Sequence, residues 1–329
     1  MNKVLTLAAA AAAALLVAGQ GHAAPLGAMD TLKQFNVVVF GDMNTNSDVE
    51  GRTLVLGSIV GGSGTFFTRP NLAPASEYAA VVVGGEVSGG WKNINGNGNA
   101  AIAGNAQNVN MNGGTAYIAG TAKNVNGKKV TGATVSVPDI EQGLKDYSKR
   151  LTTLKPNSVT PAVKSRAEFV VTPDAAGQAV FEILDGGSFF KGINEITFVM
   201  NGADSVVINV GGLDLNIAEN FLGGIGSRIA SSLIWNFYEA TKITFGSEFY
   251  GTVLAPYAQV QNGNAVNGTI VAESLTLRGA ARQYAFNGDI AFPVPIVALP
   301  QEDVPEPATA ALLLAGLAAA WALRRKSLR

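Results

Sequence analysis

Five oxygen-bearing side chains alternate along one short stretch, at Asp42, Asn44, Asn46, Asp48 and Glu50. Carboxylate and amide oxygens are the ligands that Ca²⁺ takes, and calcium loops place them at alternate positions. Two positions depart from an EF-hand loop, because Ser47 stands where Gly is needed and Thr53 stands at the closing Glu. In an extended strand the five side chains would share one solvated face. The favoured interpretation is therefore a polar turn between strands, with a Ca²⁺ site as the alternative.

The composition excludes most nucleophilic and metal chemistry. The chain has no Cys, and its one histidine is His22, near the N-terminus. Cys nucleophiles, Ser-His pairs and zinc sites built from His or Cys are thereby excluded from the rest of the chain. A pair of carboxylates could still cleave glycosidic bonds, but no motif singles out such a pair. We predict no catalytic residue and no cofactor apart from the Ca²⁺ alternative, and keep a polysaccharide-active enzyme as the second hypothesis.

Aromatic and hydroxyl residues offer two weaker candidates. Trp235, Phe237 and Tyr238 could stack on sugars, although alternation in a strand favours core packing for the first two. Trp91 follows Gly89-Gly90 and is the better candidate for an exposed aromatic. Ice binding would need threonines in register. Thr252 and Thr269 repeat, but Thr115 and Thr121 are not aligned with them, so ice binding ranks third.

The elements that must position these residues are short repeats. Gly251-Thr252-Val253-Leu254-Ala255 returns 17 residues later as Gly268-Thr269-Ile270-Val271-Ala272. A strand and a corner repeated at a short period are typical of a β-solenoid coil. A second block aligns Val82-Val83-Gly84, Ile102-Ala103-Gly104 and Ile118-Ala119-Gly120 at steps of 20 and 16 residues. Asparagines follow these runs, and we expect them to stack in ladders at the corners.

One segment has helical rather than β periodicity. Apolar residues recur every three or four positions between Asp139 and Leu154, and Pro156 follows. This pattern predicts one amphipathic helix over Asp139–Leu154, packed against the stack. Strand patterns resume after it, so the β-solenoid domain is predicted over 26–292, with a Pro-rich linker over 293–303.

Both ends carry targeting signals. Residues 1–23 combine Lys3, an apolar Ala/Leu/Val run and small residues, which predicts a helical signal peptide cut by signal peptidase. At the other end, Val304-Pro305-Glu306-Pro307 precedes an apolar span, Ala308 to Leu323, and the cluster Arg324-Arg325-Lys326. This order predicts a transmembrane helix whose basic end stays in the cytoplasm. No basic stripe supports nucleic-acid binding.

The segment 304–329 resembles a PEP-CTERM sorting signal. That resemblance implies recognition by an exosortase, cleavage near Pro305-Glu306-Pro307 and transient anchoring in the inner membrane. The processed protein would then reach the cell surface or extracellular matrix of a Gram-negative bacterium.

The body resembles the choice-of-anchor A domain, which is similar to the ice-binding-like adhesive β-solenoids. The resemblance rests on Phe35-Asn36-Val37, Ser47-Asp48-Val49-Glu50-Gly51-Arg52, Leu233-Ile234-Trp235-Asn236-Phe237 and the two Gly-Thr repeats. It implies a mainly β fold, a β-solenoid with one long α-helix packed alongside. It also implies a non-enzymatic adhesin, which we expect to act in biofilm or exopolysaccharide association.

Overall fold

The computed structural model describes residues 26–222 and 226–293. These residues are mainly β, and every pairing between their strands is parallel, as stacked coils require. The predicted solenoid is therefore confirmed. None of the helices in these two ranges is long and apolar enough to cross a membrane. The predicted signal peptide, the linker beyond Pro293 and the predicted membrane helix lie outside the described residues.

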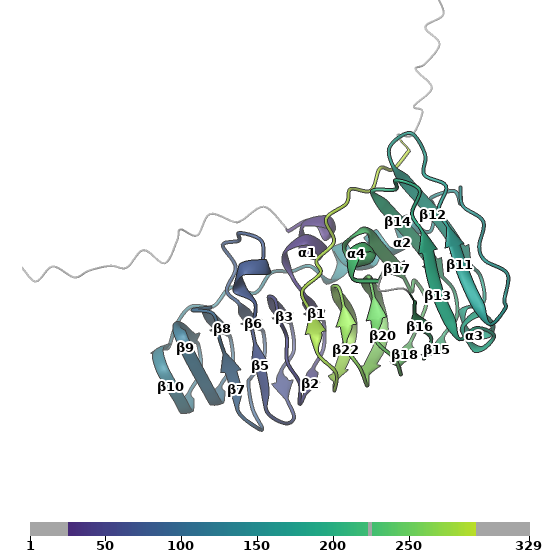
Figure 1. Cartoon of the computed structure of the whole chain (residues 1–329). Helices are drawn as coiled ribbons and strands as arrows, with labels where there is room; N and C mark the ends of the chain where they lie inside the picture. The colour runs from purple at the N-terminus through teal and green to yellow at the C-terminus, as the bar shows by residue number, and fades with distance from the viewer. Residues whose placement is uncertain (1–25, 223–225, 294–329) are drawn as a thin grey trace, which may run out of the picture. The chain divides into compact units, whose positions relative to one another are not determined.

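The chain enters the stack in its middle rather than at one end. Helix α1 (Ala28–Gln34) leads into β1 (Val37–Val39). Strand β1 pairs with β3 (Thr53–Val55) on one side and with β22 (Ile270–Leu277) on the other. The first and last coils are thus neighbours, as the purple and yellow-green strands in Figure 1 show. We call this junction the seam.

From the seam the N-terminal coils wind outward and end at β10. One wall of these coils is formed by β3, β6, β8 and the second part of β9, and its successive strands pair in that order. A second wall contains β5, β7 and the first part of β9, and β2 pairs with β4 in another. The N-terminal strands beyond the seam are β2 (Met43–Thr45), β4 (Ile59–Val60), β5 (Gly64–Phe66), β6 (Val81–Val83), β7 (Lys92–Ile94), β8 (Ala100–Ile102), β9 (Ala106–Ile118) and β10 (Ala122–Thr131), with the 3₁₀ turn η1 (Pro70–Leu72).

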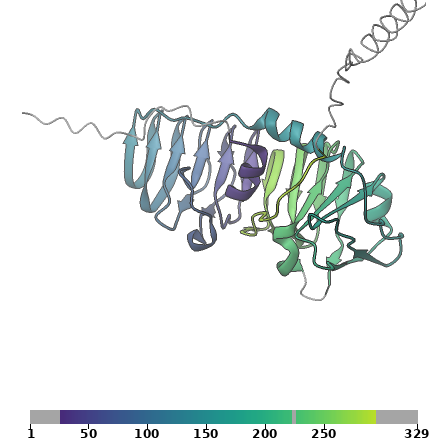
Figure 2. The same ribbon diagram turned by 90° about the horizontal axis from the view of Figure 1, so that it is seen from above.

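Helix α2 (Glu141–Leu151) then carries the chain back across the seam, as Figure 2 shows. It is shorter than the predicted Asp139–Leu154. Asp139 does not cap it, since the N-cap residue is Ile140 and makes no side-chain cap bond. At the other end, the Thr152 and Thr153 hydroxyls bond the carbonyls of Lys149 and Arg150, which closes the last turn early.

The second half of the chain winds from the far end back to the seam. Its elements are β11 (Arg166–Val170), β12 (Gln178–Ile183), α3 (Gly186–Lys191), β13 (Glu195–Val199), β14 (Ser205–Val210), β15 (Asp214–Ile217), β16 (Asn220–Phe221), α4 (Gly226–Ile229), η2 (Ala230–Ser232), β17 (Leu233–Asn236), β18 (Lys242–Phe245), β19 (Phe249–Tyr250), β20 (Thr252–Asn262), β21 (Val266–Asn267), β22 and β23 (Ala281–Arg282). In this half α3 follows β12 in the chain and packs against β15, the strand that pairs with β18.

The register of the coils tests the predicted repeats. Strands β20 and β22 pair Val253 with Ile270 and Ala255 with Ala272, which confirms the 17-residue step. Ile102 pairs with Ile118, which confirms the 16-residue step. The 20-residue step was wrong, because Val83 rather than Val82 lies opposite Ile102. The loop before β8 is one residue shorter than the apolar pattern suggested.

Helix α2 joins coils from both sides of the seam. Lys145 forms an ion pair with Glu141 and lies 5.4 Å from the ring centre of Phe40 and 5.3 Å from that of Tyr257. Its buried side places Ser148 against the β17 coil, where the Ser148 hydroxyl donates to Asn236 Oδ1 at 2.5 Å. Because Phe40 follows β1 and Tyr257 belongs to β20, one helix contacts coils on both sides of the seam.

The two halves have different cores. Small aliphatic residues such as Val83, Ala100 and Ile118 fill the N-terminal coils. The C-terminal coils enclose a cluster of rings, in which Phe169 stacks on Phe198 with centroids 4.8 Å apart and Trp235 is fully buried. Aromatic side chains occupy more volume, so the C-terminal coils accommodate a helix and longer loops.

Candidate functional site

A flat grid of asparagines covers one wall of the N-terminal coils. Outward residues of a strand recur at every second position, and here they are Asn or Trp in three successive coils. Strands β7, β9 and β10 pair Asn93 with Asn110 and Asn110 with Asn126, which puts the columns in register. We call this grid the asparagine face. It comprises Trp91, Asn93, Asn95, Asn108, Asn110, Asn112, Asn124 and Asn126.

Amide-to-amide hydrogen bonds hold the face together. Asn110 Nδ2 donates to Asn93 Oδ1 at 3.0 Å, and Asn126 Nδ2 donates to Asn110 Oδ1 at 2.8 Å. A second column joins Asn112 to Asn95 at 2.7 Å. The predicted asparagine ladders are thus present, although these rungs lie on paired strands rather than at the corners. Each amide has two donors and two acceptor lone pairs, so part of every group stays available to solvent or ligand.

The corner beside the face explains why asparagine is used there. Asn108 and Asn124 have φ of 56° and 52°, and Asn is among the side chains that tolerate this left-handed region. Gly89 occupies the equivalent corner one coil earlier, with φ of 83°. Asn108 Nδ2 donates to the Gly89 carbonyl, and Asn124 Nδ2 donates to Asn108 Oδ1. The column therefore continues through the corner.

A buried lysine supports the turn that presents Trp91. Lys92 points inward and is 1% exposed, and its Nζ donates to the carbonyls of Gly62, Ser88 and Gly90 at 2.7–3.1 Å. Burial lowers the pKa of Lys92 to about 8. Trp91 itself is 37% exposed, which confirms the prediction that it is an exposed aromatic.

The structure gives the predicted calcium residues separate roles. Asp42 Oδ1 accepts the N–H of Ser58 at 2.8 Å, and Asp48 Oδ1 accepts the N–H of Thr65 at 3.0 Å. Asn105 does the same for Thr121, so these are corner contacts from one coil to the next. Asn44 and Asn46 are exposed beside them. Within 26–222 and 226–293, no group of three or more His, Cys, Asp or Glu residues could hold a metal ion.

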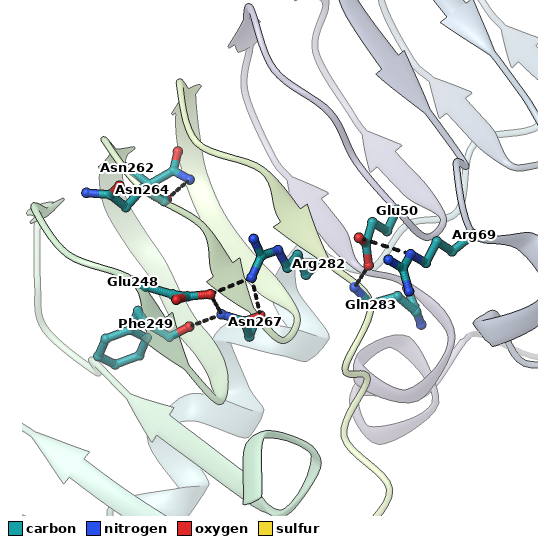
Figure 3. A network of polar contacts seen from close by, with 9 residues as sticks. All are labelled: Glu50, Arg69, Glu248, Phe249, Asn262, Asn264, Asn267, Arg282 and Gln283. Carbon is teal, nitrogen blue, oxygen red and sulfur yellow. Dashed lines mark hydrogen bonds and ion pairs between the residues drawn. The ribbon is translucent and has the colours of Figure 1, made fainter. Parts of the chain in front are cut away.

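All five residues belong to the first coil at the seam, but the Glu50 side chain, unlike those of Asp42 and Asp48, contacts the last coil. Its Oε2 accepts the N–H of Gln283 at 3.0 Å, and its Oε1 lies 3.3 Å from Arg69 Nε. On the neighbouring coils, Glu248 forms an ion pair with Arg282 and accepts from Asn267 Nδ2. Figure 3 shows both pairs. These contacts explain the Ser47–Arg52 motif, because it joins the first coil to the last one.

An open groove of about 940 Å³ follows the seam. Two of its cations are paired, since Arg69 lies beside Glu50 of the lining and Lys33 bonds Asp289, which is outside the lining. Glu50 is the one carboxylate among the described residues that line the groove, so no carboxylate pair is offered there. The lining residues are Lys33, Glu50, Arg69, Leu72, Pro74, Ser231, Arg282, Gln283, Tyr284, Ala285, Phe286 and Asn287.

The remaining sequence candidates are buried. Trp235 and Phe237 are 0% exposed, which confirms the core interpretation. Thr252 and Thr269 are also 0% exposed, and the Thr269 hydroxyl donates to the carbonyls of Leu32 and Phe35. This repeated threonine pair therefore contributes nothing to an exposed array. The sequence pattern revealed the ladders but not that they form one face of the coils, which the spacing of Trp91, Asn93 and Asn95 could have indicated.

The stacked parallel coils and the flanking helix define a class of protein, the β-solenoids. Residues 28–283 match a family model described as "Putative Ice-binding-like adhesive domain", and the chain belongs to this family. Residues 303–326 match the PEP-CTERM protein-sorting motif, a range that includes Val304–Pro307 and Arg324–Lys326, all outside the described residues. Together the two matches support an exported cell-surface protein of a Gram-negative bacterium. No curated protein and no solved structure matches the chain.

Proposed function

We propose that the protein is a non-enzymatic adhesin that binds an extracellular polysaccharide through the asparagine face, within the matrix of a biofilm. The observation that carries this proposal is the registered grid of Asn93, Asn110 and Asn126 and their neighbours. Uncharged amides both donate and accept hydrogen bonds, as sugar hydroxyls do. Trp91 at the end of one row adds an exposed ring against which a sugar could stack.

The geometry of the grid suits a polymer. Its rows are ~4.8 Å apart between coils, and equivalent side chains along a strand are about 6.6–7 Å apart. Each contact is weak, but a chain that bridges several rows gains from the high effective concentration of the next contact. A flat uncharged wall therefore favours a linear, repeating ligand over a small one.

Delivery follows from the ends of the chain. The segment 1–23 would be removed by signal peptidase, and the apolar span Ala308 to Leu323 would hold the protein in the inner membrane. An exosortase would then cut near Pro305-Glu306-Pro307 and release it to the cell surface or matrix. Substitution of Glu306 by Ala is expected to leave uncleaved protein in the membrane fraction, and normal processing of this variant would contradict the assignment.

Affinity electrophoresis tests the binding proposal. The purified protein is run through gels that contain individual bacterial exopolysaccharides, and at least one should retard it. Trp91→Ala and Asn112→Ala should each reduce this retardation, because both side chains are exposed on the face. The control is Gln142→Ala, which removes an exposed amide from α2.

Three results would argue against the proposal. Equal retardation of Trp91→Ala and Gln142→Ala would show that binding does not use the asparagine face. Release of reducing ends from the polysaccharide would show an enzyme instead. Thermal hysteresis without polysaccharide retardation would show an ice-binding protein.

A further inference from the structure

A second pocket lies far along the chain from the asparagine face, between α3 and the β15–β16 corner. Its volume is about 550 Å³, within the ~300–1,000 Å³ of ordinary ligand pockets. Helix α3 forms one wall through Phe190 and Lys191. Strand β15 forms the other through Asp214 and Asn216. The lining residues are Gly187, Phe190, Lys191, Ile193, Asn194, Asp214, Asn216, Ala218, Glu219 and Asn220.

Glu219 is the unusual group in this pocket. Leu215 and Ile217 are buried on the inner face of β15, and position 219 continues their alternation, so an apolar residue is expected there. Instead a carboxyl group stands at this position and is only 7% exposed. Burying such a group is costly unless it is paired or hydrogen-bonded.

The carboxyl has few partners. Glu219 Oε2 accepts the N–H of Ala218 at 3.0 Å, and no cation pairs with it among the described residues. Burial raises the pKa of Glu219 to about 7, so much of it is protonated near neutral pH. A protonated carboxyl can both donate and accept hydrogen bonds, which is what a hydroxyl group needs.

The rest of the lining has the same mixed character. The side-chain amides of Asn216 and Asn220 are exposed and make no hydrogen bond to other described residues. Asp214 is partly neutralised by Lys242, 3.3 Å away, and Lys191 is exposed at the end of α3. The wall contributed by Phe190 and Ile193 is apolar. The pocket thus combines amides, one partly protonated carboxyl, opposite charges that offset each other, and an apolar side.

We propose that the pocket between α3 and β15 binds a single uncharged sugar ring, with Glu219 and Asn216 hydrogen-bonding its hydroxyl groups. A sugar ring has hydroxyls around its edge and C–H groups on its faces, which matches polar groups on several sides and an apolar wall at Phe190. This site is separate from the asparagine face, so it does not depend on the proposed function. The ring could be a free sugar or the terminal residue of a glycan.

Isothermal titration calorimetry of the purified protein tests the site, with glucose, galactose, mannose, xylose and N-acetylglucosamine, each free and as its methyl glycoside. At least one sugar should bind with a Kd on the order of 1 mM or tighter. Binding of the glycoside as well as the free sugar would indicate a chain end, and binding of the free form alone would indicate a soluble sugar. Absence of heat with the whole panel would overturn the proposal.

Variants then locate the bound sugar. Asn216→Leu should weaken binding by ~10-fold or more, which corresponds to about 1.4 kcal/mol. Trp91→Ala should leave it unchanged, since Trp91 belongs to the asparagine face. A wild-type protein that binds a sugar in the calorimeter but is retarded by no polysaccharide would refute the proposed function alone. A wild-type protein that is retarded but binds no sugar of the panel would refute this site alone.

The pH dependence provides a readout that a purely structural role would not change. Wild-type affinity should fall between about pH 5.5 and about pH 8.5 as Glu219 ionises, because a buried carboxylate can no longer donate. Lys191 from α3 and Asp214 from β15 line the pocket, Lys242 from β18 pairs with Asp214, and all three remain in every variant. Glu219→Gln keeps the hydrogen-bonding capacity and should bind with a flat profile. If the sugar affinity of Glu219→Gln falls with pH as steeply as that of the wild type, Glu219 is not the group that hydrogen-bonds the sugar.

Discussion

The buried contact between α2 and the β17 coil predicts a large effect for one substitution, Asn236→Leu. Asn236 is 0% exposed, and its Nδ2 donates to the Ser148 carbonyl and to Asn209 Oδ1, both at 2.8 Å. Its Oδ1 accepts from the Ser148 hydroxyl. Asn209 in turn donates to the Leu151 carbonyl at 3.0 Å. Leucine has a similar shape but can make none of the three hydrogen bonds of the Asn236 side chain.

The magnitude follows from the groups left behind. Ser148 can turn its hydroxyl to a helix carbonyl, but its own carbonyl and Asn209 Oδ1 stay buried without this partner. Each such group costs about 1–3 kcal/mol, and the buried leucine returns ~1–2 kcal/mol. We expect the free energy of unfolding to fall by about 3 kcal/mol, a large part of the ~5–15 kcal/mol of a typical domain.

Urea unfolding followed by tryptophan fluorescence measures this change, since Trp235 is buried next to the substituted residue. Amide hydrogen exchange should show faster exchange across α2 than in β8, because the helix loses its anchor to the coils. The matched control is Gln142→Leu, an exposed amide on the same helix, with an expected change within ~0.5 kcal/mol. A loss below ~1 kcal/mol for Asn236→Leu, with unchanged exchange in α2, would refute the anchoring role of this network.

Three further perturbations test the coil geometry. Gly268→Ala should lower the free energy of unfolding by at least ~2 kcal/mol, because the new Cβ would collide with the Gly251 carbonyl. The control is Gly143→Ala, in open space on α2, which should raise the free energy of unfolding by ~0.5–1 kcal/mol. Thermal melts compare the two variants. Lys92→Met should abolish a dependence of stability on pH. The pKa of Lys92 in the folded state lies below its unfolded value of 10.5, so the unfolded state binds more protons between about pH 8 and 10.5. The wild type should therefore gain stability relative to the variant as the pH rises through this window, by up to ~1.4 kcal/mol per pH unit in urea titrations. A stability difference between the two proteins that does not change with pH would contradict the lowered pKa of Lys92. Millimolar CaCl₂ should leave the melting temperature within ~1 °C, since Asp42 and Asp48 bond backbone N–H groups; a larger rise that Asp48→Asn removes would restore the calcium alternative.

Local patterns in the sequence determined the coils. The Gly251 and Gly268 repeat predicted a pairing that the structure has in the same register, because inward and outward positions alternate strictly along a strand. The apolar stripe of α2 was equally informative, and only its ends differed. The asparagine ladders followed from the same reasoning, since a side chain at a corner meets its equivalent one coil away.

Long-range placement was decided by the tertiary structure alone. Nothing in the local pattern shows that β1 pairs with β22, since any two coils offer the same parallel edge. The alternation of Asp42, Asp48 and Glu50 could not reveal that two of them bond the next coil and the third bonds Gln283 from the last one. Glu219 was missed because its environment depends on how α3 covers β15. The sequence thus determined the repeating strands of the coils and the presence of asparagine ladders, because both depend on neighbouring residues. The order of the coils and the environment of each carboxylate depend on contacts between residues distant in the chain, and only folding brings those together.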